Sequence, residues 1–225
     1  MTLCLVTDRR LLVPPGASDR EASRCLVAQA RHAADAGVDL IHVRERDLEA
    51  AALAALVTAV LDAVRGTATR VVVNDRLDVA VGCGAHGVHL RGDSIPVGAA
   101  RRLVPQAFLI GRSVHSVGEA HDAQGADYLV AGTVFRSESK PENHPLLGID
   151  GLTAVVRAAA APVLAIGGVT VERFASVSAT GAAGVAAIGL FMRPERAASD
   201  RCRAAALTDV VARARRTFDS VNSHP

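Results

Sequence analysis

Short apolar segments alternate along the chain with longer, alanine-rich segments whose apolar positions recur with helical periodicity. Eight of the short segments are rich in Val, Ile and Leu and have the length of buried strands. The pattern predicts strands at residues 3–7, 40–44, 71–74, 87–90, 108–113, 128–133, 163–166 and 184–189.

Helix signals lie between these predicted strands. Ser18 stands three residues before Glu21, and Ser116 three residues before Glu119, which is the spacing of a capping box at the start of a helix. A glycine that would end a helix recurs just before several strands. The repeated segments are Ala36-Gly37-Val38-Asp39, Gly84-Ala85-His86-Gly87, Gly125-Ala126-Asp127-Tyr128 and Gly181-Ala182-Ala183-Gly184.

Eight strands that alternate with helices indicate an α/β protein with a parallel sheet covered by helices. Eight repeats favour a single (β/α)8 TIM barrel over residues 1–225, with a frayed polar tail from about residue 217. A doubly wound open sheet is the alternative. Its first strand should be followed by a GxGxxG segment, which residues 8–16 lack.

Composition narrows the class of protein. Hydrophobic residues make up 50% of the 225 residues but aromatic residues only 3%, so small aliphatic side chains must fill the core. The net charge of +2 arises from 25 basic and 23 acidic residues that are dispersed, which argues against nucleic acid as a partner. No apolar run approaches the ~20 residues of a membrane span, and charge follows the first few residues too early for a signal peptide. We therefore expect a cytoplasmic protein without a membrane partner.

Function in such a barrel is expected at the carboxyl ends of the strands. Because strand side chains alternate, His42, Arg44 and Arg46 share one face of the second strand and point into the barrel mouth. Two guanidinium groups there require an anionic partner, either a substrate phosphate or carboxylate, or a carboxylate of the rim.

The third and fifth strands also end in polar residues. Asn74 and Asp75 end the third strand, and the carboxylate is suited either to Mg²⁺ or to capping the next helix. Ser113 and His115 share a face at the end of the fifth strand. The imidazole is suited to proton transfer near neutral pH, or alternatively to a hydrogen bond at the following helix start.

The last three strands are followed by loops that are suited to anions. Ser137, Ser139 and Lys140 follow the sixth strand, where the alternative is an ordinary solvated loop. Glycines follow the seventh and eighth strands, where barrels often bind phosphate through backbone N–H groups. The candidate phosphate-binding residues are Gly167, Gly168, Ile188 and Gly189.

These segments together resemble the thiamine phosphate synthase/TenI family over nearly the whole chain. The family's synthases join a pyrimidine diphosphate to a thiazole phosphate and release pyrophosphate with Mg²⁺. Its TenI-like members are thiazole tautomerases, which shift a proton on a carboxylated thiazole phosphate and need no cofactor. The matching segments are Leu5-Val6-Thr7-Asp8-Arg9, Asn74-Asp75-Arg76, Gly87-Val88-His89-Leu90, Ala126-Asp127-Tyr128, Ala165-Ile166-Gly167-Gly168-Val169 and Gly184-Val185-Ala186.

The resemblance includes departures from the synthase pattern. The Gln-x-Arg-x-Lys motif that holds the diphosphate becomes His42, Arg44 and Arg46. The second acidic Mg²⁺ ligand, two residues before a proline, aligns with Ser94, although Asp93 is adjacent. These departures argue against efficient ionisation of a diphosphate, and residues 41–46 and 110–116 look like the tautomerase branch.

The resemblance therefore favours a thiazole tautomerase, an isomerase of thiamine biosynthesis, in which His115 would transfer the proton. Its partner would be a small phosphorylated thiazole, and a homo-oligomer is left open. The alternative is a thiamine phosphate synthase, a transferase in which Asn74 is retained and Asp75 would bind Mg²⁺. A second alternative is a non-catalytic regulator that binds a phosphorylated ligand. A Schiff-base aldolase is disfavoured because the only lysine, Lys140, lies in a loop.

Overall fold

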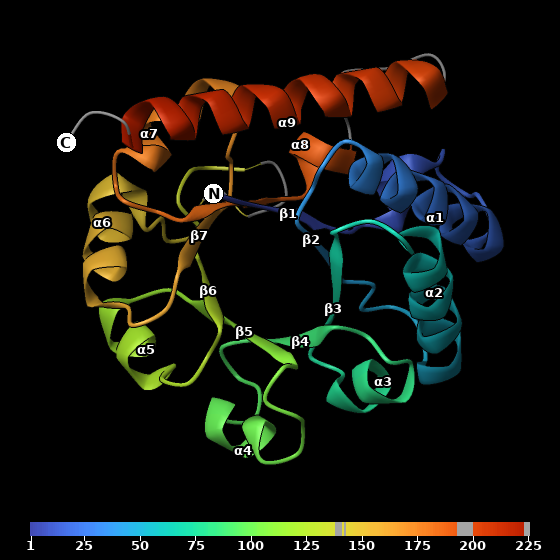
Figure 1. The fold of residues 1–225 in the computed structure, drawn as a ribbon, viewed down its shortest axis with the longest axis horizontal. Coiled ribbons are helices and arrows are strands. Elements are labelled where there is room, and N and C mark those ends of the chain that lie inside the picture. Colours follow the sequence, from blue (N-terminus) through green and yellow to red (C-terminus); the bar gives the residue numbers. More distant parts are fainter. Residues whose placement is uncertain (138–140, 142, 193–199, 223–225) are drawn as a thin grey trace.

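A closed barrel of eight parallel strands, in the order in which they occur along the chain, forms the centre of the molecule (Figure 1). The computed structural model describes residues 1–137, 141, 143–192 and 200–222. The strands are β1 Thr2–Val6, β2 Leu40–Val43, β3 Arg70–Asn74, β4 Gly87–Leu90, β5 Leu109–Val114, β6 Tyr128–Ala131, β7 Val163–Ile166 and β8 Gly184–Ala187. All eight predicted strands are present, so the prediction of a single TIM barrel is confirmed and the open sheet is excluded.

Helices surround the barrel on its outer side (Figure 1). The α-helices are α1 Asp19–Asp35, α2 Ala50–Ala63, α3 Leu77–Gly82, α4 Val97–Arg101, α5 Val117–Asp122, α6 Gly148–Ala158, α7 Phe174–Ser178, α8 Gly189–Met192 and α9 Asp200–Asn222. Short 3-10 turns, η1 Arg9–Leu12 and η2 Val171–Arg173, follow β1 and β7. Several helices have only one or two turns, so packing on the sheet rather than intrinsic propensity holds them.

The predicted helix signals act as expected. The Ser18 hydroxyl accepts the backbone N–H of Glu21 at 3.2 Å, and Ser116 accepts that of Glu119 at the same distance. Gly37, after α1, has a φ of +88°, a left-handed conformation that other residues rarely adopt. The capping serines and this glycine fix where the chain leaves a helix and enters the next strand.

Two hydrophobic cores lie on the two faces of the sheet. The larger one fills the space between the strands and the surrounding helices. The smaller one lies inside the barrel and consists of Cys4, Val6, Leu40, Val72, Tyr128, Val130, Leu164 and Ala186. Since side chains alternate along a strand, the next inward positions of β2–β5 form the layer above this inner core, near the mouth.

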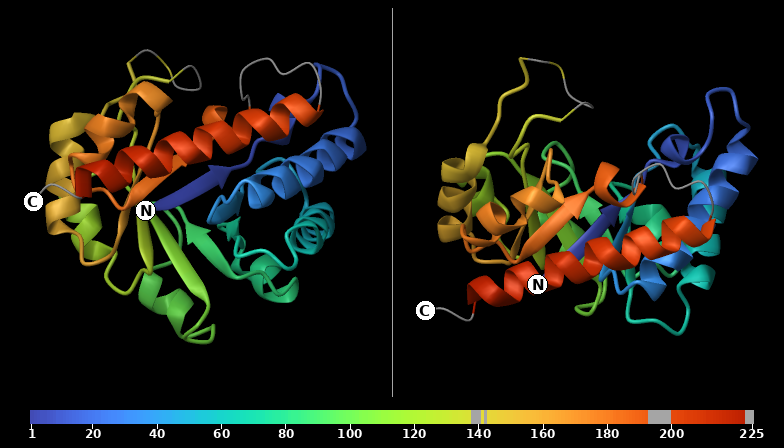
Figure 2. Two further views of the ribbon diagram at one scale, coloured as in Figure 1. Left: turned by 45° about the horizontal axis from the view of Figure 1, so that its top comes forward. Right: turned by 90° about the horizontal axis from the view of Figure 1, so that it is seen from above.

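The long C-terminal helix α9 crosses the outside of the barrel and packs against α7 and α1 (Figures 1 and 2). Phe218 on this helix is 1% exposed. The helix continues to Asn222, so the tail expected to fray from about residue 217 is instead helical there, because its apolar face is buried. Within the described segments, no helix combines the length and apolarity that crossing a bilayer requires.

Closure of the barrel depends on a close approach between β8 and β1. Thr2 pairs with Gly184, and a Cβ added at Gly184 would lie 1.8 Å from the Thr2 carbonyl oxygen. Any side chain at this position would therefore push the two strands apart.

We expect Gly184→Ala to lower the free energy of unfolding by about 1–3 kcal/mol, because the new methyl group meets backbone that has no room to move. Gly98→Ala is the matched control, since a Cβ at this helical position meets nothing within 4 Å. Urea denaturation of both variants provides the measurement. Equal stabilities would show that the closure is not tightly packed at Gly184.

Candidate active site

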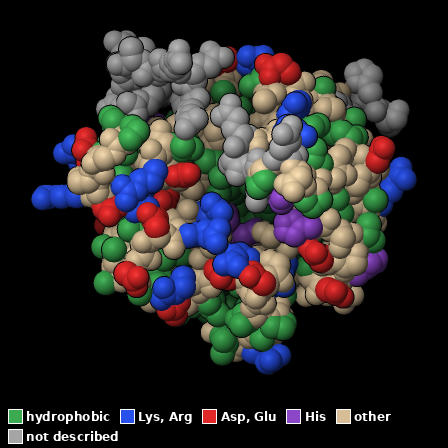
Figure 3. Space-filling model, turned by 180° about the vertical axis from the view of Figure 1, so that it is seen from behind, with side chains coloured by type: hydrophobic (Ala, Val, Ile, Leu, Met, Phe, Trp, Pro, Cys, Tyr) green, Lys and Arg blue, Asp and Glu red, His purple; other side chains and the backbone are tan. Residues whose placement is uncertain are grey.

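The carboxyl ends of the eight strands form a mouth on one face of the barrel, the face shown in Figure 3. Basic side chains and histidines gather around the hollowed centre of this face (Figure 3). Polar groups at this position agree with the rule that barrels place their chemistry at the carboxyl ends of the strands.

A layer of hydrogen-bonded polar side chains lies inside the barrel on the β2–β5 side. His42 is 4% exposed, and its Nε2 lies 3.2 Å from Asn74 Oδ1. His89 is 2% exposed, with Nε2 at 2.9 Å from Ser113 Oγ and Nδ1 at 3.1 Å from the Tyr128 hydroxyl. The two imidazole rings stand 4.5 Å apart between centroids. The layer therefore connects four neighbouring strands and reaches across to β6.

Burial keeps both imidazoles neutral. Burial lowers the pKa of His42 well below its usual range, and the nearby His89 and Arg44 lower it further. Burial, followed by the charge of Arg112, lowers the pKa of His89 to about 3. Neutral imidazoles have one N–H donor each, so this layer supplies directed hydrogen bonds and no positive charge.

His42 lies on β2, and Arg44 and Arg46 follow the end of the strand with increasing exposure. His42 is buried, Arg44 is half-buried and Arg46 is exposed. Burial lowers the pKa of the Arg44 guanidinium, and the charge of Arg46 lowers it further. The positive charge of this strand end is thus concentrated at the rim, above the neutral histidine.

Glu45, between these two arginines, faces away from the mouth into a network that the sequence reasoning missed. Its carboxylate accepts the Thr7 hydroxyl at 2.6 Å and Arg9 Nη1 at 2.9 Å. The Thr7 hydroxyl in turn accepts the backbone N–H of Arg44 at 2.9 Å. Arg9 is 1% exposed and also binds Asp47. Oppositely charged residues after adjacent strands were the available signal, and this network fixes the backbone from which Arg44 projects.

Asp75 follows β3 in a left-handed conformation with a φ of +62°. Its backbone N–H donates to the His89 carbonyl at 2.9 Å, and its Oδ1 accepts the hydroxyl of Ser94. Helix α3 has no side-chain cap, so the alternative role of Asp75 as a helix cap is not observed. The structure therefore brings Asp75 together with the loop after β4, at the rim beside Asn74.

The opposite side of the mouth is formed by the loops after β6, β7 and β8. Gly167 and Gly168 have φ values of +100° and +60°, and a Cβ at Gly168 would lie 2.3 Å from the Arg136 carbonyl oxygen. Ile188 packs against the inner core, and Gly189 begins α8. Gly167 and Gly168 require glycine because the loops after β6 and β7 approach each other there, which leaves backbone rather than side chains at this part of the rim.

The loop after β6 is described only in part. Ser137 is half-buried there, whereas Ser139 and Lys140 lie outside the described residues. The carbonyl of Gly167 accepts the backbone N–H of Phe135 at 3.0 Å, and Arg173 lies over the Phe135 ring at 4.5 Å. These contacts hold the start of this loop against the β7 loop.

His115 lies just beyond β5 and is exposed. Its backbone N–H donates to the Glu119 carboxylate at 2.7 Å, and its Nδ1 contacts the carbonyl oxygen of Gly132. A second histidine, His144, has Nε2 at 3.1 Å from the hydroxyl of Thr133. His144 was not singled out from the sequence, because its segment has no strand or helix pattern.

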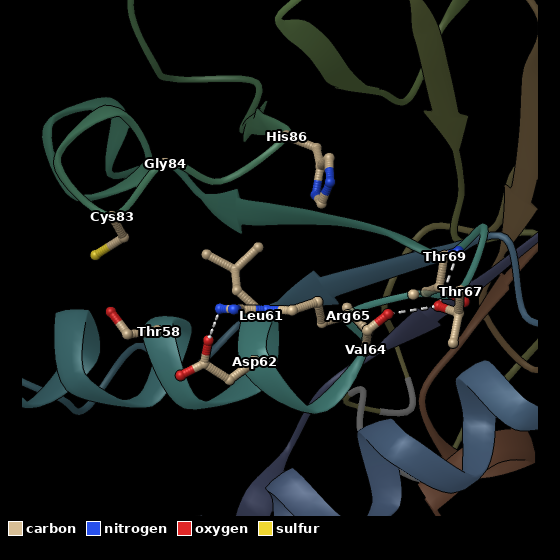
Figure 4. Close-up of a pocket in the computed structure, with 11 residues that line it drawn as sticks. Thr58, Leu61, Asp62, Val64, Arg65, Thr67, Thr69, Cys83, Gly84 and His86 are labelled. Carbon is tan, nitrogen blue, oxygen red and sulfur yellow. Dashed lines mark hydrogen bonds and ion pairs between the residues drawn. The ribbon is translucent and has the colours of Figure 1, made fainter.

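A separate hollow of about 440 Å³ lies at the other face of the barrel, between the end of α2 and the turn before β4 (Figure 4). Its polar groups are engaged locally. Arg65 pairs with Asp62, the Thr69 hydroxyl donates to the Val38 carbonyl at 2.7 Å, and His86 Nδ1 accepts the Val71 N–H at 3.0 Å. The amino-terminal face of a barrel serves stability rather than chemistry, so we assign no site there.

Comparison with known proteins gives the family. The family described as "Thiamine monophosphate synthase" matches residues 5–191. A thiamine-phosphate synthase of Roseiflexus castenholzii is 40% identical over 200 residues, which cover 87% of this chain and 86% of the relative. A thiamine-phosphate synthase of Methanoculleus marisnigri is 43% identical over 161 residues, which cover 71% of this chain and 76% of the relative.

Solved structures agree with the sequence comparison. A thiamine phosphate pyrophosphorylase from Pyrococcus furiosus has a TM-score of 0.77 and 29% identity, covering 98% of this chain and 96% of the other. A 3-hexulose-6-phosphate synthase has a TM-score of 0.65 at 22% identity, covering 93% and 99%, which shows the barrel fold alone.

The expectation of a thiazole tautomerase is wrong. Four relatives are 40–44% identical to this chain over alignments that cover 71–87% of it, and all four are named thiamine-phosphate synthases. The departures at His42 and Ser94 from the synthase pattern are part of the basis of that expectation. In the structure His42 hydrogen-bonds Asn74 and Ser94 hydrogen-bonds Asp75, so both substituted residues remain part of the site.

The neutral histidine layer predicts a pH dependence of stability. Both folded-state pKa values lie below the unfolded value near 6.5, so the unfolded chain takes up more protons, and stability is lost as the pH falls below about 6.5. Each imidazole contributes a slope of up to about 1.4 kcal/mol per pH unit.

His42→Gln should reduce that slope by up to about 1.4 kcal/mol per pH unit, because one titrating group is removed. Urea denaturation between about pH 7.5 and pH 5 measures it, and the exposed His121→Gln is the control. A slope identical to that of the wild type would mean that His42 is protonated in the folded protein.

Proposed function

The chain belongs to the thiamine monophosphate synthase family, and from that membership we propose that it is a thiamine-phosphate synthase. The reaction would join the methylene carbon of a pyrimidine diphosphate to the ring nitrogen of a thiazole phosphate and release pyrophosphate. The observation that carries the proposal is the shared rim of β2–β4, where Asn74 and Asp75 stand beside the arginines that follow β2.

The two sides of the mouth are suited to the two substrates. A diphosphate carries several negative charges, and the guanidinium groups of Arg44 and Arg46 match its oxygens with paired donors. Across the mouth, backbone at Gly167, Gly168 and Gly189 is suited to the single phosphate of the thiazole. Ser137 at this side would orient the thiazole. Ser139 and Lys140 follow Ser137 closely in the sequence, and we propose the same role for them.

The residues present fit a bound Mg²⁺. Among the described residues, no group of three or more His, Cys, Asp or Glu side chains converges as a metal cage. Mg²⁺ commonly binds through one or two carboxylates together with substrate phosphates. Asp75 offers one carboxylate at the rim, so it would hold the ion jointly with the diphosphate. When bound, the ion would neutralise charge on the departing pyrophosphate.

The protein's own residues contribute by stabilising charge. Breaking the carbon–oxygen bond leaves the electron pair on the pyrophosphate, and Arg44 and Arg46 face that developing charge. The bond that then forms uses the lone pair of the thiazole nitrogen. Ser113, whose hydroxyl is held by the neutral His89, can donate to an oxygen of the diphosphate without adding charge. Asn74 is held in the same way by His42. His115 is given no proton-transfer role in this reaction.

The direct test supplies thiazole phosphate, pyrimidine diphosphate and Mg²⁺ to the purified chain. We expect equal amounts of thiamine phosphate and pyrophosphate. Chromatography measures the thiamine phosphate, and a coupled enzymatic assay measures the pyrophosphate. Saturable binding of both substrates without either product would contradict the proposal and favour a binding protein.

We expect Asp75→Asn to lower kcat/KM by about 100-fold or more, because it removes the carboxylate that would hold the metal and its diphosphate. Asp78→Asn is the matched control, since Asp78 is an exposed carboxylate paired with Arg76. Steady-state rates at several Mg²⁺ concentrations measure both variants. Equal rates for Asp75→Asn and wild type would remove Asp75 from the site.

A further inference from the structure

Arg91 is the first residue after β4, and its side chain turns toward Asp75 at the rim. Nη1 of Arg91 lies 3.7 Å from Asp75 Oδ2, and Nη2 pairs with the Asp93 carboxylate. The other oxygen of Asp75 accepts the Ser94 hydroxyl. A guanidinium group therefore stands beside the carboxylate that we assign to the diphosphate site.

The backbone that carries Arg91 is fixed by side chains from neighbouring elements. The Arg91 N–H donates to Ser94 Oγ at 2.8 Å. Arg112, on β5, donates to the carbonyls of Gly92 at 2.8 Å and Ile95 at 3.0 Å. These contacts tie the loop of residues 91–96 to β5. The backbone position of Arg91 is thus supported by side chains of Ser94 and Arg112.

Arg91 shares the electrostatic environment of the two arginines after β2. Its positive charge is among those that lower the pKa of Arg44, together with the charge of Arg46. Its own carboxylate partners are exposed or half-exposed, since Asp93 is 69% and Asp75 33% exposed. Such ion pairs are weak in water, so the guanidinium group can exchange them for a stronger anionic partner.

We propose that Arg91 binds the diphosphate directly, as a third arginine beside Arg44 and Arg46. The inference rests on the proposed function and adds a residue to its diphosphate site. In the free protein Asp75 and Asp93 hold the guanidinium group at the rim. In the complex its paired N–H donors would turn to diphosphate oxygens, whose charge exceeds that of a carboxylate. Arg91 would then contribute to diphosphate affinity even without a divalent cation.

The test measures binding of inorganic pyrophosphate to the full chain by isothermal titration calorimetry with EDTA present. We expect Arg91→Gln to weaken binding about tenfold, which corresponds to one charge-assisted interaction. Arg91→Lys should bind with intermediate affinity, because it keeps the charge but loses the fork geometry. Arg65→Gln is the matched control, since Arg65 is also paired with an aspartate but lies at the opposite face of the barrel.

The outcomes separate this inference from the proposed function. Wild-type affinity in Arg91→Gln, or an equal loss in Arg65→Gln, would overturn the role of Arg91. If the wild type still makes thiamine phosphate in the same preparation, the proposed function stands regardless. If the wild type neither binds pyrophosphate nor makes product, both proposals fail.

Discussion

The hydrogen bonds between β1 and β8 decide where every candidate functional side chain lies. Thr2 pairs with Gly184 and Leu5 with Ala187, and these contacts turn a parallel sheet into a barrel. Closure leaves no free sheet edge and brings the carboxyl ends of all strands to one rim. Without it, the glycine loops after β7 and β8 would not face the arginines after β2. The space that Gly184 leaves for the Thr2 carbonyl is thus a condition for a two-sided mouth.

Much of the fold could be predicted because its signals are local. Apolar strand segments, the capping serines and glycines such as Gly37 act within a few residues of themselves. The polar networks could not be predicted in this way. Arg9 and Glu45 are 36 residues apart, and His89 and Tyr128 are 39 apart. Such pairs depend on how separate strands and loops come together in the closed barrel, which a single sequence does not specify.

The same limitation explains the error about the reaction. When a substitution is judged alone, a serine in place of an acidic metal ligand suggests that metal binding is lost. In three dimensions Ser94 hydrogen-bonds Asp75, and the loop that carries Ser94 also carries Arg91. Similarly, His42 is a neutral side chain that hydrogen-bonds Asn74, so it provides polar contacts without charge. The chemistry of a site belongs to the group of residues and is poorly judged one position at a time.

This grouping also separates two tasks within the mouth. The buried imidazoles of His42 and His89 are neutral, so they orient Asn74 and Ser113 without repelling a cation or attracting an anion. The charge that faces an anion comes from arginines, whose guanidinium groups stay protonated in proteins. The buried pair of imidazoles therefore adds no charge to the mouth near neutral pH.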